Sequence, residues 1–300
     1  MTSRILLILA FSFSVNYFNA QKNSDSLRLE IIRLLENKDL TLGLAISSSD
    51  GLDTLSINGK SHLPMQSVFK FHIALIVLSK VDAGLFSLKQ KIAIKKEDLH
   101  PGTWSPIRDK FPNGTKMTLA EIIHYTVALS DNNGCDLLIS FVGGIPEIQN
   151  YFKAKGINEL SIVQNEEEMQ KVWENQFKNW TTPLCANQLL IDLNNYKLLS
   201  KTSTDFMIKT LKSTSTGPDR IRGLLSKKAV VAHKTGSSGL NEENGITAAT
   251  NDIGIVYLPN GTYFYISFFV SNSKENLETN EMLIASISKV TYDYFLNKNK

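Results

Sequence analysis

The chain has 300 residues, of which 42% are apolar and 20% charged, and its formal net charge is +3 at pH 7. This length suits one large domain or two closely packed ones, and the apolar fraction supports a substantial core. The balanced charge and the absence of a Lys/Arg stripe argue against nucleic acid as a partner.

The N-terminus has the pattern of a secretory signal peptide. Arg4 precedes an apolar run over residues 5–11, and small or polar residues follow as far as Ala20. The run is too short for a comfortable transmembrane helix. We predict that residues 1–20 are a signal peptide, with an uncleaved anchor as the alternative. The mature protein would be exported to the periplasm without stable membrane association.

The next part of the chain begins with a helix and two strands. Residues 25–36 have helical periodicity. Strand-like runs at 41–47 and 53–58 are joined by the turn sequence Ser48-Ser49-Asp50-Gly51. These elements predict the start of a sheet packed against a helix.

From about residue 64 to 212 the patterns are mainly helical. Residues 66–80 are apolar on all sides, which is typical of a buried helix. Thr118-Leu119-Ala120-Glu121 is a capping box that opens another helix. A further helix at about 132–142 should stop at Gly143-Gly144, with Pro146 in the first turn of its successor.

Strands return near the end of the chain. Residues 229–236, 253–258 and 263–270 have strand character, and the last two runs flank the turn sequence Pro259-Asn260-Gly261. A helix at about 275–296 closes the chain.

This order predicts an α/β (α+β) fold in which both ends of the chain join one antiparallel sheet flanked by terminal helices. Residues 21–63 plus 213–300 would form this α/β lobe, and residues 64–212 an inserted all-α lobe. A cleft between two lobes is a common place for a functional site.

The two cysteines are Cys135 and Cys185. An exported pair can form a disulfide. However, Cys135 lies in an apolar segment typical of a buried helix, so we predict two free, buried thiols.

The first candidate for chemistry is Ser67-Val68-Phe69-Lys70, a Ser-x-x-Lys motif. Residues three apart on a helix share a face. A serine in the first turn lies near free backbone N–H groups and the positive end of the helix dipole. An uncharged Lys70 could take the hydroxyl proton and activate Ser67 as a nucleophile.

This motif alone is weak evidence, because it occurs twice more in the chain. We expect Ser271-Asn272-Ser273-Lys274 to be a loop after a strand. Ser286-Ile287-Ser288-Lys289 should lie on the C-terminal helix with Lys289 in solvent.

Two further tripeptides single out the first copy. Ser130-Asp131-Asn132 begins 63 residues after Ser67, and Lys234-Thr235-Gly236 begins 104 residues after Ser130. The ordered trio is typical of class A β-lactamases and penicillin-binding proteins. Each tripeptide alone is also common as a turn or a strand end.

The trio has a consistent chemical interpretation. Ser130 can relay a proton to a departing lactam nitrogen, and Asn132 can bind the acylamide side chain of a substrate. Lys234 and Thr235 can bind a carboxylate. The backbone N–H groups of Ser67 and Ser237 can form an oxyanion hole.

The sequence resembles class A serine β-lactamases over nearly the whole mature chain. Locally it resembles the extended-spectrum cephalosporinase branch of PER- and VEB-type enzymes. The stretches that carry the resemblance are Pro64–Phe71, Thr103–Pro106, Phe111–Thr115, Ser130–Asn132 with Gly134–Asp136, Asn165-Glu166 and Val231–Gly236.

The resemblance implies that Glu166 activates the water that deacylates the enzyme. The residues alone would not select it, because Glu166-Glu167-Glu168 is a charge run that usually indicates a solvated loop. Family members commonly have Asn four residues later to help hold this water, and here Gln170 takes that position. Whether Lys70 or Glu166 is the acylation base stays open.

Three more residues have roles implied by the resemblance. The family commonly carries an Arg on the strand after Lys-Thr-Gly, but residues 250–254 contain none, so Arg220 is our candidate replacement for binding the substrate carboxylate. A surface charge is the alternative for Arg220. Trp104 resembles the aromatic wall at the cleft mouth, with ordinary partial burial as the alternative. His233 should point away from Lys234 and be structural.

We therefore expect a β-lactam hydrolase that acts on penicillins and cephalosporins, including oxyimino-cephalosporins. The histidines lack zinc-ligand spacing, and we expect no metal and no organic cofactor. Expected partners are β-lactam antibiotics and mechanism-based inhibitors, and a monomer is the expected state. The alternatives are a D,D-peptidase or penicillin-binding protein, and a non-hydrolytic β-lactam sensor.

Overall fold

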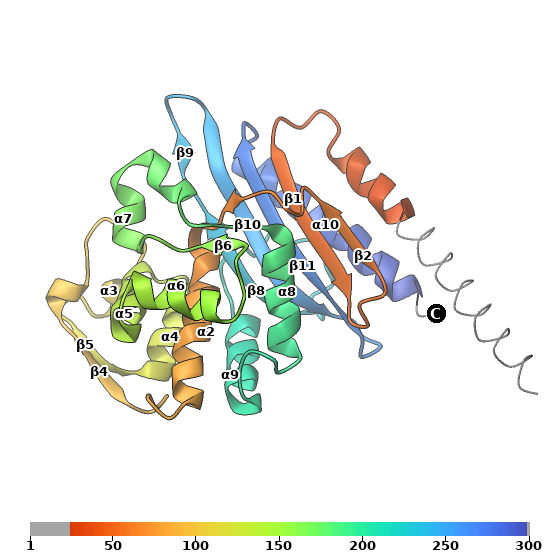
Figure 1. The fold of residues 1–300 in the computed structure, drawn as a ribbon. Helices are drawn as coiled ribbons and strands as arrows, with labels where there is room; N and C mark the ends of the chain where they lie inside the picture. Colours follow the sequence, from red (N-terminus) through yellow and green to blue (C-terminus); the bar gives the residue numbers. More distant parts are fainter. Residues whose placement is uncertain (1–24, 299–300) are drawn as a thin grey trace, which may run out of the picture.

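A six-stranded antiparallel sheet organises the protein (Figure 1). The computed structural model describes residues 25–298. The strand order is β2-β1-β11-β10-β8, and β9 pairs with β10. The strands are β1 (Thr41–Ser48), β2 (Thr54–Ile57), β8 (Val230–Ser237), β9 (Leu240–Asn241), β10 (Ile246–Tyr257) and β11 (Tyr263–Ser273). The two ends of the chain therefore share one sheet, as predicted from the sequence.

Both faces of the sheet are covered. On one face the helix of residues 25–34 and α10 (Leu277–Lys298) form a core with Phe268 and other strand residues. On the other face Phe269 and its neighbours join the core of the helical segment. Adjacent residues of one strand point to opposite faces, so each enters a different core. The central strands β10 and β11 are consequently buried almost throughout, without the alternation of buried and exposed residues that a sheet with one solvated face shows.

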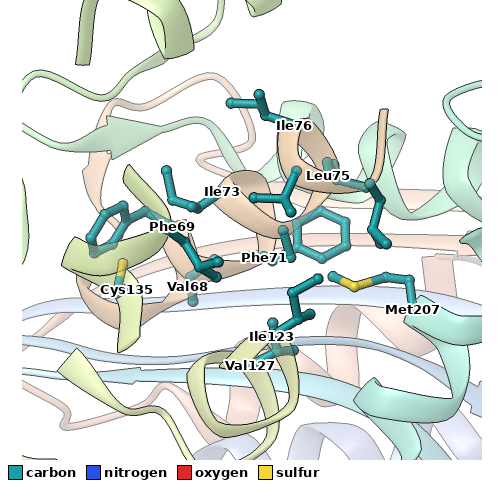
Figure 2. Close-up of a cluster of buried hydrophobic side chains, with 14 of the residues drawn as sticks. Val68, Phe69, Phe71, Ile73, Leu75, Ile76, Ile123, Val127, Cys135 and Met207 are labelled. Carbon is teal, nitrogen blue, oxygen red and sulfur yellow. The ribbon is translucent and has the colours of Figure 1, made fainter. Parts of the chain in front are cut away.

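Helix α2 forms the centre of the helical segment (Figure 2). It is buried from its first residue to Leu78 because neighbouring helices surround it. Its side chains pack with Ile123 and Val127 of α4 and with Met207 of α9. The helices of this part are α2 (Phe69–Asp82), α3 (Pro106–Lys110), α4 (Leu119–Ala128), α5 (Asn132–Val142), α6 (Ile145–Ala154), α7 (Glu166–Lys171), α8 (Pro183–Asn194) and α9 (Lys201–Lys212). Three short 3-10 helices accompany them, η1 (Gln66–Val68), η2 (Lys96–Asp98) and η3 (Trp173–Phe177).

The predicted start and end signals of these helices are confirmed. Thr118 and Glu121 form the capping box of α4. Gly143 ends α5 at φ 112°, a left-handed conformation that glycine adopts without a Cβ clash. Pro146 lies in the first turn of α6.

The inserted segment is not purely helical, which corrects the expected all-α lobe. It contains the short strands β3 (Leu63–Pro64), β4 (Lys91–Ile94), β5 (Thr115–Thr118), β6 (Leu160–Ser161) and β7 (Trp180–Thr181). Strands of two to four residues leave no readable period in a sequence. Helix α8 also packs directly on β1 and β11, so the two predicted lobes share a broad contact. The lobe boundaries themselves stay a prediction.

The structure also places the two cysteines and the two other Ser-x-x-Lys segments. Both cysteines are free, but only Cys135 is fully buried, and Cys185 is half-buried. Ser271 and Ser273 lie within β11, not in a loop, because the strand runs three residues past the apolar run. Lys289 is half-exposed on α10, where it pairs with Asp293.

Candidate active site

A cleft of about 780 Å³ lies between β8 and the helical segment. Most of the predicted site residues line it, namely Ser67, Trp104, Ser130, Asn132, Glu166, Gln170, Thr235 and Ser237. Lys70 and Lys234 are fully buried next to it. Residues as far apart in the sequence as Ser67 and Ser237 therefore meet at one place.

Ser67 lies in η1, the 3-10 turn that leads directly into α2. The turn is held against the sheet from two sides. The amide of Asn251 on β10 donates to the carbonyls of Pro64 and Met65, at 2.8 and 3.1 Å. On β8, Gly236 approaches so closely that a Cβ there would lie 2.5 Å from the Met65 carbonyl oxygen. The sheet thus fixes the position of the Ser67 backbone.

Lys70 connects Ser67 to Asn132 on α5 and Glu166 on α7. Its Nζ donates to Ser67 Oγ at 2.7 Å and to Asn132 Oδ1 at 2.8 Å. It also forms a buried ion pair with Glu166. A proton that leaves Ser67 therefore has a continuous hydrogen-bonded path through Lys70 to a carboxylate.

Glu166 enters the cleft because of how α7 begins. Asn165 caps the helix by accepting from the Glu168 N–H at 2.9 Å. Asp136 on α5 accepts from the N–H groups of Glu166 and Glu167, at 2.8 and 3.0 Å. Glu166 is 5% exposed, whereas the next two glutamates face solvent. Burial raises the pKa of Asp136 to about 6.

Ser130 and Lys234 join the helical side to the sheet. Ser130 has φ 60° in the connection between α4 and α5, a left-handed conformation that aims its hydroxyl into the cleft. Lys234 Nζ donates to Ser130 Oγ at 2.9 Å and to the Thr235 carbonyl at 2.8 Å. Burial, and then the neighbouring charge of Lys70, lower the pKa of Lys234 well below its usual value.

Arg220 is not a surface charge. It is 4% exposed, and Nη1 donates to the carbonyls of Gly236 and Asn251 at 3.0 and 2.9 Å. Nη2 donates to Ser237 Oγ at 2.7 Å, and Nε pairs with Glu281 on α10 at 3.1 Å. Arg220 is not among the residues that line the cleft, so it reaches the cleft through Ser237.

Trp104 and Gln170 lie at the rim of the cleft. Trp104 is 60% exposed, and its indole N–H donates to the Leu129 carbonyl at 2.9 Å, which holds the ring in place. Gln170 Nε2 donates to Thr103 Oγ1 at 2.7 Å. The same hydroxyl accepts from Asn132 Nδ2 at 2.5 Å. The large exposed fraction of Trp104 argues against the alternative of ordinary partial burial.

Sequence reasoning assigned no role to the residues that hold the site together, chiefly Thr103, Asp136 and Asn251. Their partners are 29 to 187 positions away, so no local pattern could reveal them. His233 is buried, does not line the cleft, and has its Nδ1 2.9 Å from Asp252 Oδ1, so its structural role stays our prediction. In residues 25–298 no group of three or more His, Cys, Asp or Glu side chains is arranged to hold a metal ion.

The fold and this cleft define a class A β-lactamase, an enzyme that hydrolyses cyclic amides. The model of the β-lactamase enzyme family (Beta-lactamase2) matches residues 26–295, and the chain belongs to this family. It is 50% identical to "Beta-lactamase VEB-1" of Pseudomonas aeruginosa over 301 residues, which cover 99% of each chain. It is 37% identical to "Extended-spectrum beta-lactamase PER-1" of the same organism, over 99% of this chain and 95% of that one.

Solved structures agree with these relatives. The crystal structure of the TLA-1 extended-spectrum β-lactamase matches with a TM-score of 0.88 and 46% identity, over 91% of this chain and 99% of that one. A β-lactamase from Chitinophaga pinensis matches with a TM-score of 0.87 and 46% identity, over 89% of this chain and 98% of that one.

Proposed function

We propose that the enzyme hydrolyses penicillins and cephalosporins, including oxyimino-cephalosporins, through an acyl-enzyme on Ser67, and so confers antibiotic resistance. The observation that carries this proposal is the chain of contacts Ser67–Lys70–Glu166, with Ser130 and Lys234 beside it. The relatives with extended-spectrum names support the substrate range.

Acylation begins when Ser67 Oγ attacks the lactam carbonyl and loses its proton towards Lys70 or, through a water, Glu166. The N–H groups of Ser67 and Ser237 stabilise the oxyanion. Removal of one such donor typically costs about 10²–10³ in rate. Ser130 then passes a proton to the lactam nitrogen as the C–N bond breaks, and its contact with Lys234 supports this role.

Substrate binding uses both walls of the cleft. Asn132 binds the acylamide side chain, and Lys234 with Thr235 binds the carboxylate. Arg220 supports this carboxylate site through Ser237. Trp104 packs against the substrate at the cleft mouth, where its large exposed ring is available.

Deacylation separates this function from its alternatives. Glu166 takes a proton from a water that attacks the ester, and Gln170 helps to shape the space that this water occupies. A D,D-peptidase, a penicillin-binding protein or a sensor keeps its acyl group for long times. The buried carboxylate of Glu166 next to Lys70 favours hydrolysis over a stable adduct.

The test is turnover of a chromogenic cephalosporin by the mature protein and two variants. Ser67→Ala should abolish hydrolysis. Glu166→Ala should still bind the drug covalently, visible as a mass increase, while steady-state turnover collapses. Normal turnover by Glu166→Ala would contradict the deacylation role. The acylation rate of Glu166→Ala also distinguishes the two candidate acylation bases. A fast acylation burst in this variant would assign the role to Lys70, because the Glu166 carboxylate is absent.

We also propose that the protein is exported to the periplasm. The predicted signal peptide, residues 1–20, lies outside the described residues, and within residues 25–298 no helix is long and apolar enough to cross a membrane. We propose a monomer in the periplasm that also reacts with mechanism-based inhibitors. The N-terminal sequence of the exported protein tests the predicted cleavage after Ala20, and a start far from Gln21 on either side would contradict it.

A further inference from the structure

A second, smaller cavity lies next to the cleft. Its volume is about 60 Å³, against about 780 Å³ for the cleft. A water molecule occupies about 30 Å³ in the liquid and needs polar partners in a protein cavity. The small cavity therefore has room for a few water molecules and is too small for a β-lactam.

Four residues line both cavities and form a partition between them, Thr103, Asn132, Glu166 and Gln170. The Thr103 hydroxyl holds the partition together, because it accepts from the amides of Asn132 and Gln170. Oε1 of Glu166 contacts Lys70, whereas Oε2 has no hydrogen-bond partner among residues 25–298. The carboxylate of Glu166 thus has an acceptor atom available to water from either side.

The outer side of the small cavity reaches the protein surface. It is lined by His100, Pro101, Asn133, Asp136 and Glu167. The side chains of His100 and Glu167 are 46% and 48% exposed, and His100 Nε2 lies 3.8 Å from Glu167 Oε2. Asn133 and Asp136 supply polar groups further in. Solvent can therefore enter beside His100 without passing through the cleft.

We propose that this small cavity is a side entrance through which the hydrolytic water reaches Glu166 while the acyl group fills the cleft. The inference builds on the proposed deacylating role of Glu166. The oxygen of the water bonds to the ester carbonyl carbon, and one of its protons goes to Glu166. The bond from this carbon to Ser67 Oγ then breaks, and this proton returns from Glu166 through Lys70 to Ser67 Oγ.

The need for such a route follows from the place of the substrate side chain. Asn132, its proposed partner, is part of the partition, so a bulky side chain there covers Glu166 from the cleft side. Each turnover consumes one water, which must be replaced. With a small substrate side chain, water can still reach Glu166 through the cleft. With a bulky one, water can reach Glu166 only through the side entrance.

His100→Trp tests the route by filling the entrance without a change in the cleft. Acylation and deacylation are measured separately by stopped-flow and by mass spectrometry of the acyl-enzyme. For a cephalosporin with a bulky oxyimino side chain, deacylation should slow about tenfold. For 6-aminopenicillanic acid, which lacks an acyl side chain, it should change less than about twofold. Acylation should be unchanged, and His100→Phe should give a smaller slowing.

His62→Trp is the matched control. His62 is also an exposed histidine, 55% exposed, with Nε2 3.8 Å from Oε2 of Glu159, and it lines neither cavity. This variant should deacylate both substrates like the unmodified protein. An equal effect of the two tryptophan substitutions would overturn the proposal.

Two further outcomes would also overturn it. One is unchanged deacylation of the bulky substrate by a His100→Trp variant that melts like the unmodified protein. The other is equal slowing of both substrates, which would indicate displacement of Glu166. If His100→Trp melts early, the same comparison is made with His100→Phe. Normal turnover by Glu166→Ala would instead refute the deacylation mechanism itself, so the two failures are distinguishable.

Discussion

The two walls of the cleft hold their lysines in different ways. On the helical wall, Lys70 is in contact with the carboxylate of Glu166. On the sheet wall, Lys234 contacts only the Ser130 hydroxyl and the Thr235 carbonyl, and no carboxylate within residues 25–298 pairs with it. Both side chains are fully buried.

This difference separates two chemical tasks. A buried lysine next to a carboxylate can exchange a proton with it while the local net charge stays constant. A buried lysine without a carboxylate produces an uncompensated positive potential while it is charged, and this potential attracts an anion. We infer that the helical wall moves protons and the sheet wall binds the substrate carboxylate. Four predictions test this division.

Lys70→Ala should have the largest effect, because it breaks the contact path from Ser67 to Glu166 and leaves Glu166 without its cation. We expect the acylation rate to fall by about 10²–10⁴, the usual contribution of a positioned acid or base. Stopped-flow measurement of the acylation burst checks this. Lys289→Ala, in another Ser-x-x-Lys segment, is the control and should acylate normally. Comparable losses in both variants would contradict the assignment of Lys70.

Gly236→Ala should have the next largest effect, because it separates the walls. The new Cβ would lie 2.5 Å from the Met65 carbonyl oxygen, so β8 and the segment that leads into η1 must move apart. The oxyanion hole then loses its geometry, and kcat should fall by about 10²–10³. Gly239→Ala is the comparison, since nothing lies within 4 Å of a Cβ there. A similar kcat in both variants would show that this close approach is unimportant.

The pH dependence should report the unpaired Lys234. Its pKa is lowered well below 10.5, and carboxylate binding needs the charged form. The value of kcat/KM should therefore fall as pH rises through this lowered pKa. Stability has the opposite sign: between the lowered pKa and 10.5 the unfolded chain binds more protons, so this group's contribution to stability rises with pH.

Lys234→Arg is the matched variant for this profile. The guanidinium stays charged at high pH, so the alkaline limb should move upward or disappear. A limb at the same pH in both proteins would assign it to a different group.

Arg220→Ala should have the smallest of the four effects. We expect KM to rise about tenfold with a smaller change in kcat, as for the loss of one charge-assisted hydrogen bond. Steady-state kinetics with a penicillin measures this. Arg222→Ala is the control, because Arg222 also donates to backbone carbonyls from the same loop and does not line the cleft. An unchanged KM in Arg220→Ala would leave that residue as a structural link between β8 and α10.

The sequence predicted what depends on local pattern. The apolar runs gave the helices and the hairpin, and the capping box gave the start of α4, because these signals act within a few residues. The ordered trio of motifs pointed to one of three Ser-x-x-Lys segments. The short strands of the inserted segment could not be predicted, since their pairing depends on distant partners.

Glu166 is the clearest case of a residue whose environment the sequence alone did not predict. Its place in a run of three glutamates predicted solvent exposure, and only a family resemblance suggested a role. Two N–H contacts to Asp136, thirty positions earlier, turn this one carboxylate inward to Lys70. The sequence thus predicted the long helices, the main sheet and a candidate nucleophile. Tertiary structure decided which charges are buried and paired, because burial and pairing depend on contacts between residues far apart in the chain.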